Sequence, residues 1–258
     1  MEWIITAGAT SEDIDTVRSI TNHATGALGC SIAEKLANKG GSQVSKIYYI
    51  CEPSAKKPDL PCVEIRLVHG AVETARVLQK LLCTRPIAAV VHSMAVSDYT
   101  VQAAADIEQL AAALEIGLQQ GILPTKESLS AFLQESLTDG IAFSRQGKLS
   151  SNVDQLLLLL QKTPKIIGMI KEISPQTQLV GFKLLDDVSY AQLIDTAYAL
   201  LEKNACDYVL ANDLKDIRAG LHTGYLVERD RTVTKAAGKA AIAELIVDRL
   251  LFSACQER

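Results

Sequence analysis

The sequence between residues 4 and 29 decides the fold. It begins Ile4-Ile5-Thr6-Ala7-Gly8-Ala9-Thr10 and ends Thr25-Gly26-Ala27-Leu28-Gly29. The first run is an apolar strand that stops at a glycine, and the second opens a helix on Thr-Gly. The polar loop between them is far longer than an ordinary strand-to-helix turn needs. Because amides at a helix start attract phosphate, this loop is predicted to bind a phosphorylated ligand.

Composition limits the class of protein. The chain has 258 residues, 48% of them hydrophobic, and a net charge of -4, which fits one large domain or two small ones. The charge gives no basic field for nucleic acid, so no nucleic-acid partner is expected. No apolar run approaches the roughly 20 residues of a membrane helix. The longest candidate, residues 156–160, is predicted to be a short buried segment.

The cysteines and histidines indicate neither a disulfide framework nor a metal site. No two cysteines form a CxxC pair, and the four histidines have no ligand-like spacing. The N-terminus lacks the basic start and cleavage site of a signal peptide. We therefore expect a cytoplasmic protein with reduced, buried thiols at six positions: Cys30, Cys51, Cys62, Cys83, Cys206 and Cys255.

Strand and helix patterns alternate along most of the chain. This order predicts an α/β fold, a Rossmann-like, mainly parallel sheet with helices on both faces. Ligands of such sheets bind beyond the carboxyl ends of the strands, here after Ala7, near Cys51-Glu52 and over residues 92–99. The predicted strands are residues 3–7, 44–50, 63–68, 87–91, 179–185 and 208–211, with a terminal hairpin at 224–228 and 232–234. The predicted helices are residues 27–38, 71–83, 189–203 and 235–251.

The middle of the chain is less regular. Residues 106–117 and 128–136 read as helices, and Thr163-Pro164 reads as a helix start. Gln146-Gly147 between two extended runs predicts the tip of a hairpin that projects Lys148. We expect one domain over residues 1–258, with a flap or hairpin at about 138–163.

Two alternative classes share this pattern. The segment from Thr25 to Leu36 is similar to the first helix of short-chain dehydrogenases, which favours an NAD(P)-dependent reductase. However, Gly8 and Gly26 are separated by a long insert, no G-x-G-x-x-G is present, and no tyrosine precedes a lysine by four positions. The other alternative is a non-catalytic nucleotide-binding partner subunit that uses the same loop.

Five segments in order resemble the phosphopantothenate–cysteine ligase family, also called phosphopantothenoylcysteine synthetase. The first segment is the most specific, and the other four count mainly as an ordered set. They are Thr6-Ala7-Gly8-Ala9-Thr10 with Asp15-x-Val17-Arg18-x-Ile20-x-Asn22-His23-x-Thr25-Gly26; Ala95-Val96-Ser97-Asp98-Tyr99; Gly147-Lys148-Leu149-Ser150-Ser151; Val180-Gly181-Phe182-Lys183; and Ala211-Asn212-Asp213-Leu214.

The resemblance implies a reaction and its participants. The family joins L-cysteine to 4′-phosphopantothenate in coenzyme A biosynthesis through an acyl-nucleotidylate, using CTP or ATP with Mg²⁺. Main-chain amides, Mg²⁺ and a lysine would neutralise the negative charges of the carboxylate and the triphosphate in this reaction. CTP is expected here from the bacterial type of organisation. The resemblance also implies a homodimer and the stand-alone form of the enzyme, with the decarboxylase on a separate chain.

The resemblance assigns roles residue by residue. Asn22 and Lys148 are the expected catalytic residues, and no metal ligand is assigned to the protein because Mg²⁺ is expected on the nucleotide phosphates. The expected nucleotide-binding residues are Gly8, Asp98, Phe182, Asn212 and Asp213. The expected substrate-binding residues are Arg18, His23, Thr25 and Gly26.

Each assignment has a structural alternative. Asn22 or His23 can be an ordinary loop residue, Lys148 a solvated lysine, and Phe182 a core residue. Asp98 can cap a turn, and Asn212 and Asp213 can form an Asx turn. Gly29 is expected to serve close packing between helix and sheet. The chain departs from fused bacterial members at Ser150-Ser151, where these often carry two more lysines.

Overall fold

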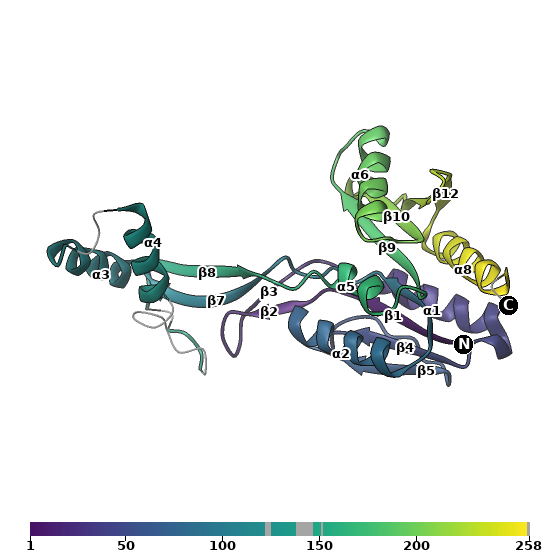
Figure 1. The fold of residues 1–258 in the computed structure, drawn as a ribbon, viewed down its shortest axis with the longest axis horizontal. Coiled ribbons are helices and arrows are strands. Elements are labelled where there is room, and N and C mark those ends of the chain that lie inside the picture. The colour runs from purple at the N-terminus through teal and green to yellow at the C-terminus, as the bar shows by residue number, and fades with distance from the viewer. Residues whose placement is uncertain (122–124, 138–146, 151, 257–258) are drawn as a thin grey trace. The chain divides into compact units, whose positions relative to one another are not determined.

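The computed structural model describes residues 1–121, 125–137, 147–150 and 152–256. The chain forms two compact units, both drawn in Figure 1. The sheet unit comprises Met1–Thr10, Asn22–Val96 and Pro164–Arg258, and the ribbon unit comprises Ser11–Thr21 and Ser97–Thr163. The predicted flap at 138–163 is therefore only one part of a second unit that also includes most of the long loop after Ala7.

The sheet unit contains an eight-stranded sheet, which confirms the predicted fold class. The spatial order is β12-β11-β10-β9-β6-β1-β4-β5. The six strands from β10 to β5 are parallel, and β11 and β12 add an antiparallel hairpin at one end. The bounds are β1 Glu2–Ala7, β4 Lys46–Cys51, β5 Val63–Leu67, β6 Ile87–His92, β9 Gln178–Leu185, β10 Tyr208–Asp213, β11 Thr223–Glu228 and β12 Val233–Ala237.

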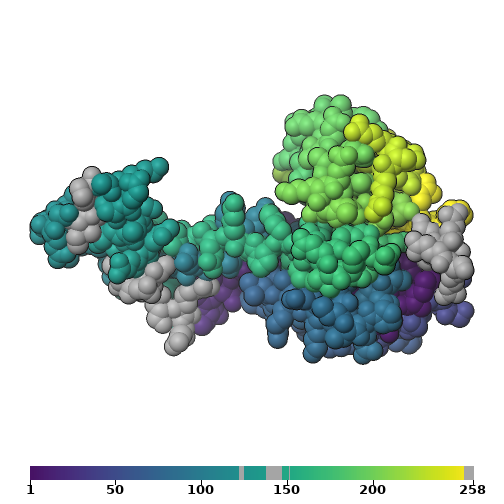
Figure 2. All heavy atoms as spheres, viewed as in Figure 1, coloured from purple at the N-terminus to yellow at the C-terminus, as the bar shows by residue number. Residues whose placement is uncertain are grey.

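Helices cover both faces of this sheet. Helices α1 (Ala27–Gly40) and α8 (Lys239–Gln256) pack on one face. Helices α2 (Gly70–Thr84), α5 (Ile166–Ile173) and α6 (Tyr190–Lys203) pack on the other, where α2 and α5 lie side by side (Figure 2). A 3-10 turn, η1 (Gly41–Gln43), follows α1, and a short helix, α7 (Leu214–Arg218), follows β10.

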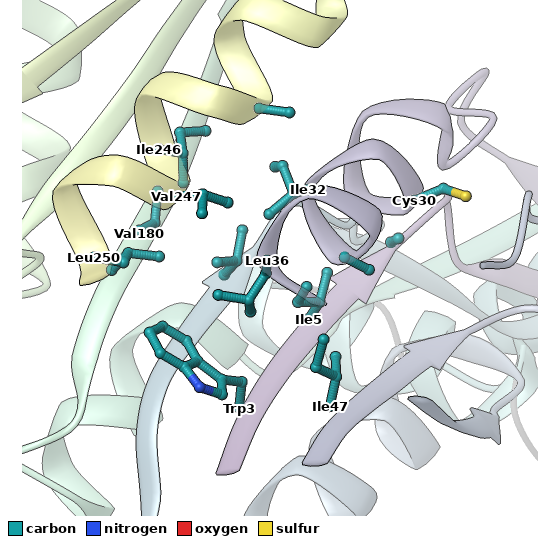
Figure 3. Packing of buried hydrophobic residues seen from close by; sticks show 14 of the residues in the cluster. Trp3, Ile5, Cys30, Ile32, Leu36, Ile47, Val180, Ile246, Val247 and Leu250 are labelled. Atoms are coloured by element: carbon teal, nitrogen blue, oxygen red, sulfur yellow. The ribbon is translucent and has the colours of Figure 1, made fainter. Parts of the chain in front are cut away.

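The two faces of β1 enter two separate cores. Successive side chains of a strand point to opposite faces, so Trp3 and Ile5 pack towards α1 and α8 while Ile4 packs towards α2 and α5. Figure 3 shows the first core, in which Trp3 and Ile5 meet Leu36 of α1 and Leu250 of α8. Full burial of each large apolar side chain contributes about 1.5–3 kcal/mol. This burial on both faces explains why the strand reads as a continuous apolar run.

The ribbon unit consists of two antiparallel strand pairs and two helices. Strands β2 (Ser11–Asp13) and β3 (Ser19–Thr21) pair within the loop after Ala7. Strands β7 (Tyr99–Asp106) and β8 (Leu156–Lys162) form a longer pair. Helices α3 (Ile107–Gln119) and α4 (Lys126–Glu135) lie between them in sequence, as the pattern predicted.

Two predictions about this region need correction. The leucine run is not buried core, because it forms β8 in a two-stranded ribbon, where Leu156 is 38% and Leu160 is 42% exposed. Thr163-Pro164 does not start a helix: α5 begins at Ile166, and the Thr163 hydroxyl donates instead to the Ser97 carbonyl oxygen at 2.5 Å. The strand β7 was not predicted. The first arm of the predicted hairpin, from residue 141 to 146, lies outside the described residues.

The last helix also starts later than predicted, because residues 233–237 form β12 and α8 begins at Lys239. Three of the described cysteines are buried as expected, at Cys30, Cys51 and Cys206. Burial raises the pKa of the Cys30 thiol to about 11 and that of Cys206 to about 12, which suits inert packing residues. Cys62 is only partly buried and Cys83 is exposed, contrary to the expectation for these two.

Gly29 allows a close approach of α1 to the sheet. A Cβ at this position would lie 2.6 Å from the Cβ of Ala7 and 2.8 Å from the Oγ of Ser93. We predict that Gly29→Ala lowers the free energy of unfolding by about 1–3 kcal/mol through overpacking. Urea denaturation followed by circular dichroism measures this change.

The matched control is Gly168→Ala in α5, where the nearest atom to a new Cβ is 3.5 Å away. That substitution should raise the free energy of unfolding by roughly 0.5–1 kcal/mol, because alanine is the better helix former. Equal effects of the two substitutions would contradict the close-packing role of Gly29.

Candidate functional site

The three strand ends predicted to hold a ligand are neighbours at one edge of the sheet. Ala7 at the end of β1 pairs with Cys51 at the end of β4, and Thr6 pairs with His92 at the end of β6. The carboxyl ends of parallel strands meet at one edge, and ligands of open α/β sheets bind there. The loops after these strands therefore define the candidate site in the sheet unit.

Backbone contacts tie the loop after β1 to the segment after β6. The Ala95 amide donates to the Gly8 carbonyl oxygen at 2.8 Å, and the Thr10 amide donates to the Ala95 carbonyl oxygen at 3.2 Å. Ala9 and Ala95 form an isolated parallel bridge. These bonds extend the pairing of β1 and β6 by three residues beyond the strands, and they fix the direction in which the chain leaves the sheet.

Two glycines at the start and end of the long loop lie against each other. Gly8 has φ 84° and Gly26 has φ 73°, in the left-handed region that favours glycine. A Cβ on Gly8 would lie 2.7 Å from the Cβ of Ala55, and one on Gly26 would lie 3.1 Å from the Gly8 amide nitrogen. Gly26 precedes α1 without a side-chain cap. The first amides of α1 are therefore available to an anion at this edge.

Asn22 lies at the same edge. Its Nδ2 donates to the Ala95 carbonyl oxygen at 3.3 Å, beside the Ala9–Ala95 bridge, and the residue is exposed. His23 and Thr25, which follow it, are also exposed. The Thr25 carbonyl oxygen accepts a hydrogen bond from the Lys56 amide at 3.0 Å. The structure thus brings together Gly8, Asn22 and Gly26 from the predicted set, and it keeps His23 and Thr25 on the same segment.

The sequence analysis missed a buried polar pair under this edge. The hydroxyl of Thr6 lies 2.8 Å from Nδ1 of His92, and it accepts a hydrogen bond from the Met94 amide at 3.3 Å. Both side chains are buried, and burial lowers the pKa of His92 to about 4. A neutral histidine therefore joins the ends of β1 and β6. The sequence signal that could have revealed this pair was the histidine that follows the predicted apolar strand of residues 87–91.

Glu52, which directly follows β4, also makes contacts that stabilise the fold. It is buried, accepts a hydrogen bond from the Gly70 amide at 2.8 Å, and lies 3.2 Å from Nδ1 of His69. Gly70 opens α2 with φ 71°. A carboxylate at the first turn of a helix is favoured by the exposed amides and by the helix dipole.

The predicted nucleotide-binding residues of the sheet unit have structural contacts. Phe182 lies on β9, partly buried against the first core, opposite Leu210 of β10. Asn212 donates through Nδ2 to the Thr223 carbonyl oxygen at 2.7 Å. Asp213 caps α7 by accepting from the Lys215 amide at 2.8 Å, and it also accepts from the Asp187 and Val188 amides.

Hydrogen bonds from these backbone amides, the Lys215 amide first, hold the pKa of Asp213 below its usual range. The Asx-turn alternative therefore describes what Asp213 does in the structure. Contact of Phe182, Asn212 or Asp213 with a nucleotide stays a prediction.

Three further predicted site residues belong to the ribbon unit: Arg18, Asp98 and Lys148. The Asp98 carbonyl oxygen accepts from the Thr163 amide at 3.1 Å, and the residue is exposed. Arg18 donates through Nε and Nη2 to the buried carboxylate of Asp15, at 2.9 and 2.5 Å. Lys148 is exposed, and within the described part of the chain its ammonium group has no ion pair or hydrogen bond.

A basic hollow lies elsewhere on the sheet unit, between β5 and α2. Its volume is about 630 Å³, and none of the predicted site residues lines it. Its cationic lining residues are Arg66, Arg76, Lys80 and Arg85. Among the residues that the structure describes, no group of three or more His, Cys, Asp or Glu side chains could hold a metal ion.

Comparison with protein families identifies the chain. The family described as the DNA/pantothenate metabolism flavoprotein C-terminal domain matches residues 1–122 and 141–252. This chain belongs to that family. The resemblance drawn from the five sequence segments is thereby confirmed at the level of the family.

Two relatives agree with the family assignment. A solved structure described as the DNA/pantothenate metabolism flavoprotein from Streptococcus pneumoniae is 35% identical, with a TM-score of 0.79, and covers 98% of this chain and 99% of that chain. The coenzyme A biosynthesis bifunctional protein CoaBC of Thermococcus kodakarensis is 31% identical over 88% of this chain and 45% of its own length. The chain thus spans about half the length of the curated relatives it matches.

A more distant structure shares the fold. A mutant of Cab2 in complex with phosphopantothenate-cysteine is 15% identical, with a TM-score of 0.67, over 99% of this chain and 86% of that chain. At this identity the likeness concerns the fold alone. The overall fold of this chain is therefore shared with a protein of low sequence identity.

The buried His92 predicts a pH dependence of stability. The folded state disfavours the protonated imidazole, so between about pH 6.5 and pH 4 the unfolded state binds more protons. The free energy of unfolding should therefore fall as the pH drops through this window, by about 3 kcal/mol from this group. We predict that His92→Gln, which keeps a polar partner for Thr6, removes this part of the slope.

Urea denaturation at intervals of half a pH unit measures both slopes. Other groups that titrate in this range contribute equally to the parent and to the variant, so the difference between the two proteins isolates His92. Parallel curves for the two proteins between pH 6.5 and pH 4 would show that His92 is not held neutral by the fold.

Proposed function

We propose that this chain is a ligase that joins L-cysteine to 4′-phosphopantothenate through an acyl-nucleotidylate intermediate, in coenzyme A biosynthesis. One observation carries the proposal: in a chain of this family, the Asn22 amide donates to the Ala95 carbonyl oxygen at the carboxyl edge of the sheet, where α1 also begins without a side-chain cap. The names of the relatives support it, because CoaBC is a coenzyme A biosynthesis protein and a Cab2 mutant is described in complex with phosphopantothenate-cysteine.

The first step is the attack of the pantothenate carboxylate on the α-phosphate of the nucleotide. A bond forms between the carboxylate oxygen and the phosphorus, and pyrophosphate leaves. Four negative charges or more meet in this step, so cations and backbone amides must offset their repulsion. The uncapped amides at the start of α1 and the exposed ammonium of Lys148 suit these roles.

The second step is the attack of the cysteine amine on the activated acyl carbon. The amine forms the amide bond and loses a proton, and the nucleoside monophosphate leaves. A tetrahedral oxyanion develops during the attack and is stabilised by hydrogen-bond donors. The amide nitrogen of Asn22 is such a donor at the strand edge.

We propose CTP as the nucleotide and Mg²⁺ as its counter-ion. Mg²⁺ commonly binds through substrate phosphates and retains several waters, so it needs few protein ligands. Bound in this way, the ion would neutralise phosphate charge.

We also propose a cytoplasmic homodimer that works with a separate decarboxylase. Of the 14 large apolar side chains that are exposed among the described residues, eight lie in the ribbon unit. A second copy of the chain could cover such side chains by a two-fold contact. Light scattering should give a mass near twice 27.8 kDa, and a monomeric mass would refute the dimer. No helix that the structure describes is suited to crossing a membrane.

A product assay tests the function. The protein is incubated with Mg²⁺, 4′-phosphopantothenate, L-cysteine and CTP or ATP in turn, and the amide product is sought by mass spectrometry. Product with CTP supports the full proposal, and product with ATP alone corrects the nucleotide. Tight nucleotide binding without pyrophosphate release would instead favour a non-catalytic partner subunit. Enhanced NADPH fluorescence would favour a reductase.

We predict that Lys148→Ala lowers the rate of pyrophosphate release by about two to three orders of magnitude, because a cation facing the phosphates is lost. Folding should be unchanged, since the side chain is exposed. Lys162→Ala, an exposed lysine on β8, is the matched control and should keep the parent rate. Pyrophosphate release at the parent rate in the Lys148 variant would remove Lys148 from the mechanism.

We predict that Asn22→Asp still forms the acyl-nucleotidylate but turns it over about 100-fold more slowly, because a hydrogen-bond donor is replaced by a carboxylate. Rapid-quench analysis should reveal the intermediate accumulating before the amide product. Asn38→Asp, at an exposed position of α1, is the control. If the Asn22 variant makes product at the parent rate, its assigned role is wrong.

A further inference from the structure

The buried carboxylate of Asp15 gathers five hydrogen-bond donors. Its Oδ1 accepts from the amides of Val17 at 2.9 Å and Arg18 at 2.8 Å, which closes a tight turn. Its Oδ2 accepts from Nε and Nη2 of Arg18 at 2.9 and 2.5 Å, and from the Leu149 amide at 3.0 Å. The Asp15 side chain is fully buried, whereas that of Arg18 is 43% exposed.

The same pair of side chains holds both polar backbone groups of Leu149. The Leu149 amide donates to Asp15, and the Leu149 carbonyl oxygen accepts from Nη2 of Arg18 at 3.3 Å. The Leu149 side chain is only 5% exposed. These contacts join segments that are more than 130 positions apart in the chain, and both segments belong to the ribbon unit. We call the pair Asp15 and Arg18, with the Leu149 backbone between them, the clasp.

The clasp acts on the residue that precedes Leu149. A peptide unit is planar, so a hydrogen bond to the Leu149 amide also orients the carbonyl group and Cα of Lys148. On the other side of Lys148, Gly147 is exposed, and a Cβ added there would meet nothing within 4 Å. Within the described residues around Lys148, the clasp is thus the anchor of its backbone.

We propose that Asp15 is a positioning residue for Lys148. The clasp sets where the lysine backbone lies, and the flexible side chain then reaches the phosphates of the nucleotide. This inference rests on the proposed function, in which Lys148 assists formation of the acyl-nucleotidylate. If the backbone of Lys148 were not held, its ammonium group would have to be ordered in every turnover. The loss of conformational entropy would then raise the barrier of the reaction.

Charge is necessary for the clasp. The Arg18 guanidinium holds the pKa of Asp15 well below its usual range, so the carboxylate stays ionised at any pH suitable for an assay. An asparagine has the same shape but only one acceptor oxygen. If that oxygen closes the turn at Val17 and Arg18, the amide nitrogen faces three donors and the bond to Leu149 is lost.

The experiment compares full-length Asp15→Asn with the parent protein and with Asp154→Asn. Asp154 is exposed in the same unit and has no hydrogen bond or ion pair within the described residues. Asp15→Asn should lower kcat for pyrophosphate release by about 10- to 100-fold and leave KM for the nucleotide within about threefold. Asp154→Asn should match the parent. A parent-like kcat for Asp15→Asn would overturn the proposal.

A double-mutant cycle separates positioning from general damage. If Asp15 acts through Lys148, Asp15→Asn combined with Lys148→Ala should be no slower than Lys148→Ala alone. If the rate reductions of the two single substitutions multiply in the double variant, Asp15 acts elsewhere and the proposal is overturned. Asp15→Glu keeps the charge for Arg18 and should fall between the parent and Asp15→Asn. This second variant keeps the test decisive if Asp15→Asn does not fold.

Hydrogen exchange of the Leu149 amide tests the clasp without any activity. Exchange should be slow in the parent and at least tenfold faster in Asp15→Asn. Fast exchange in the parent would refute the clasp itself. A parent protein with a protected Leu149 amide that releases no pyrophosphate with any triphosphate would instead refute the proposed function, and the role of Asp15 in it. The two failures are therefore distinguishable.

Discussion

The candidate site depends on three glycines close to the end of β1, at positions where a larger residue would not fit. Gly8, Gly26 and Gly29 each lie where an added Cβ would come within 3.1 Å of a neighbouring atom. The contacts of Gly8 and Gly26 bring the two ends of the long loop together, and the contact of Gly29 seats α1 directly on β1. The first turn of α1 consequently opens at the carboxyl edge of the sheet, where its amides are accessible to an anion.

The polar side chains that the sequence analysis or the structure singles out differ in whether they already bind protein groups. Glu52 and His92 are buried and hydrogen-bonded to protein groups, since burial of an unpaired polar atom would cost stability. Asn212 and Asp213, which are partly buried, also bind protein groups. They set the shapes of the loops after β4, β6 and β10. Lys148 is exposed and, in the described residues, has no such contact. This contrast supports a lysine that acts on a ligand rather than on the fold.

The ribbon unit follows different rules of burial from the sheet unit. A central parallel strand such as β1 is covered by helices on both faces, so an apolar run there becomes core. Strand β8 has a similar apolar run but pairs with β7 in a two-stranded ribbon, and both Leu156 and Leu160 stay exposed. Composition alone does not distinguish the two cases, because the number of covering layers is a property of the whole fold.

The sequence by itself determined the parallel sheet, its helices and the glycine-bounded loop, because strand and helix periods and glycine conformations are local properties. It also identified the family through short motifs. Only the tertiary structure decided which polar groups meet: Thr6 with His92, Asn212 with Thr223, and Asp15 with the backbone of Leu149. Asp15 stood in the most specific motif, yet its partner lies 134 positions away. A hydrogen bond depends on distance in space, and the spacing of residues along the chain does not encode that distance.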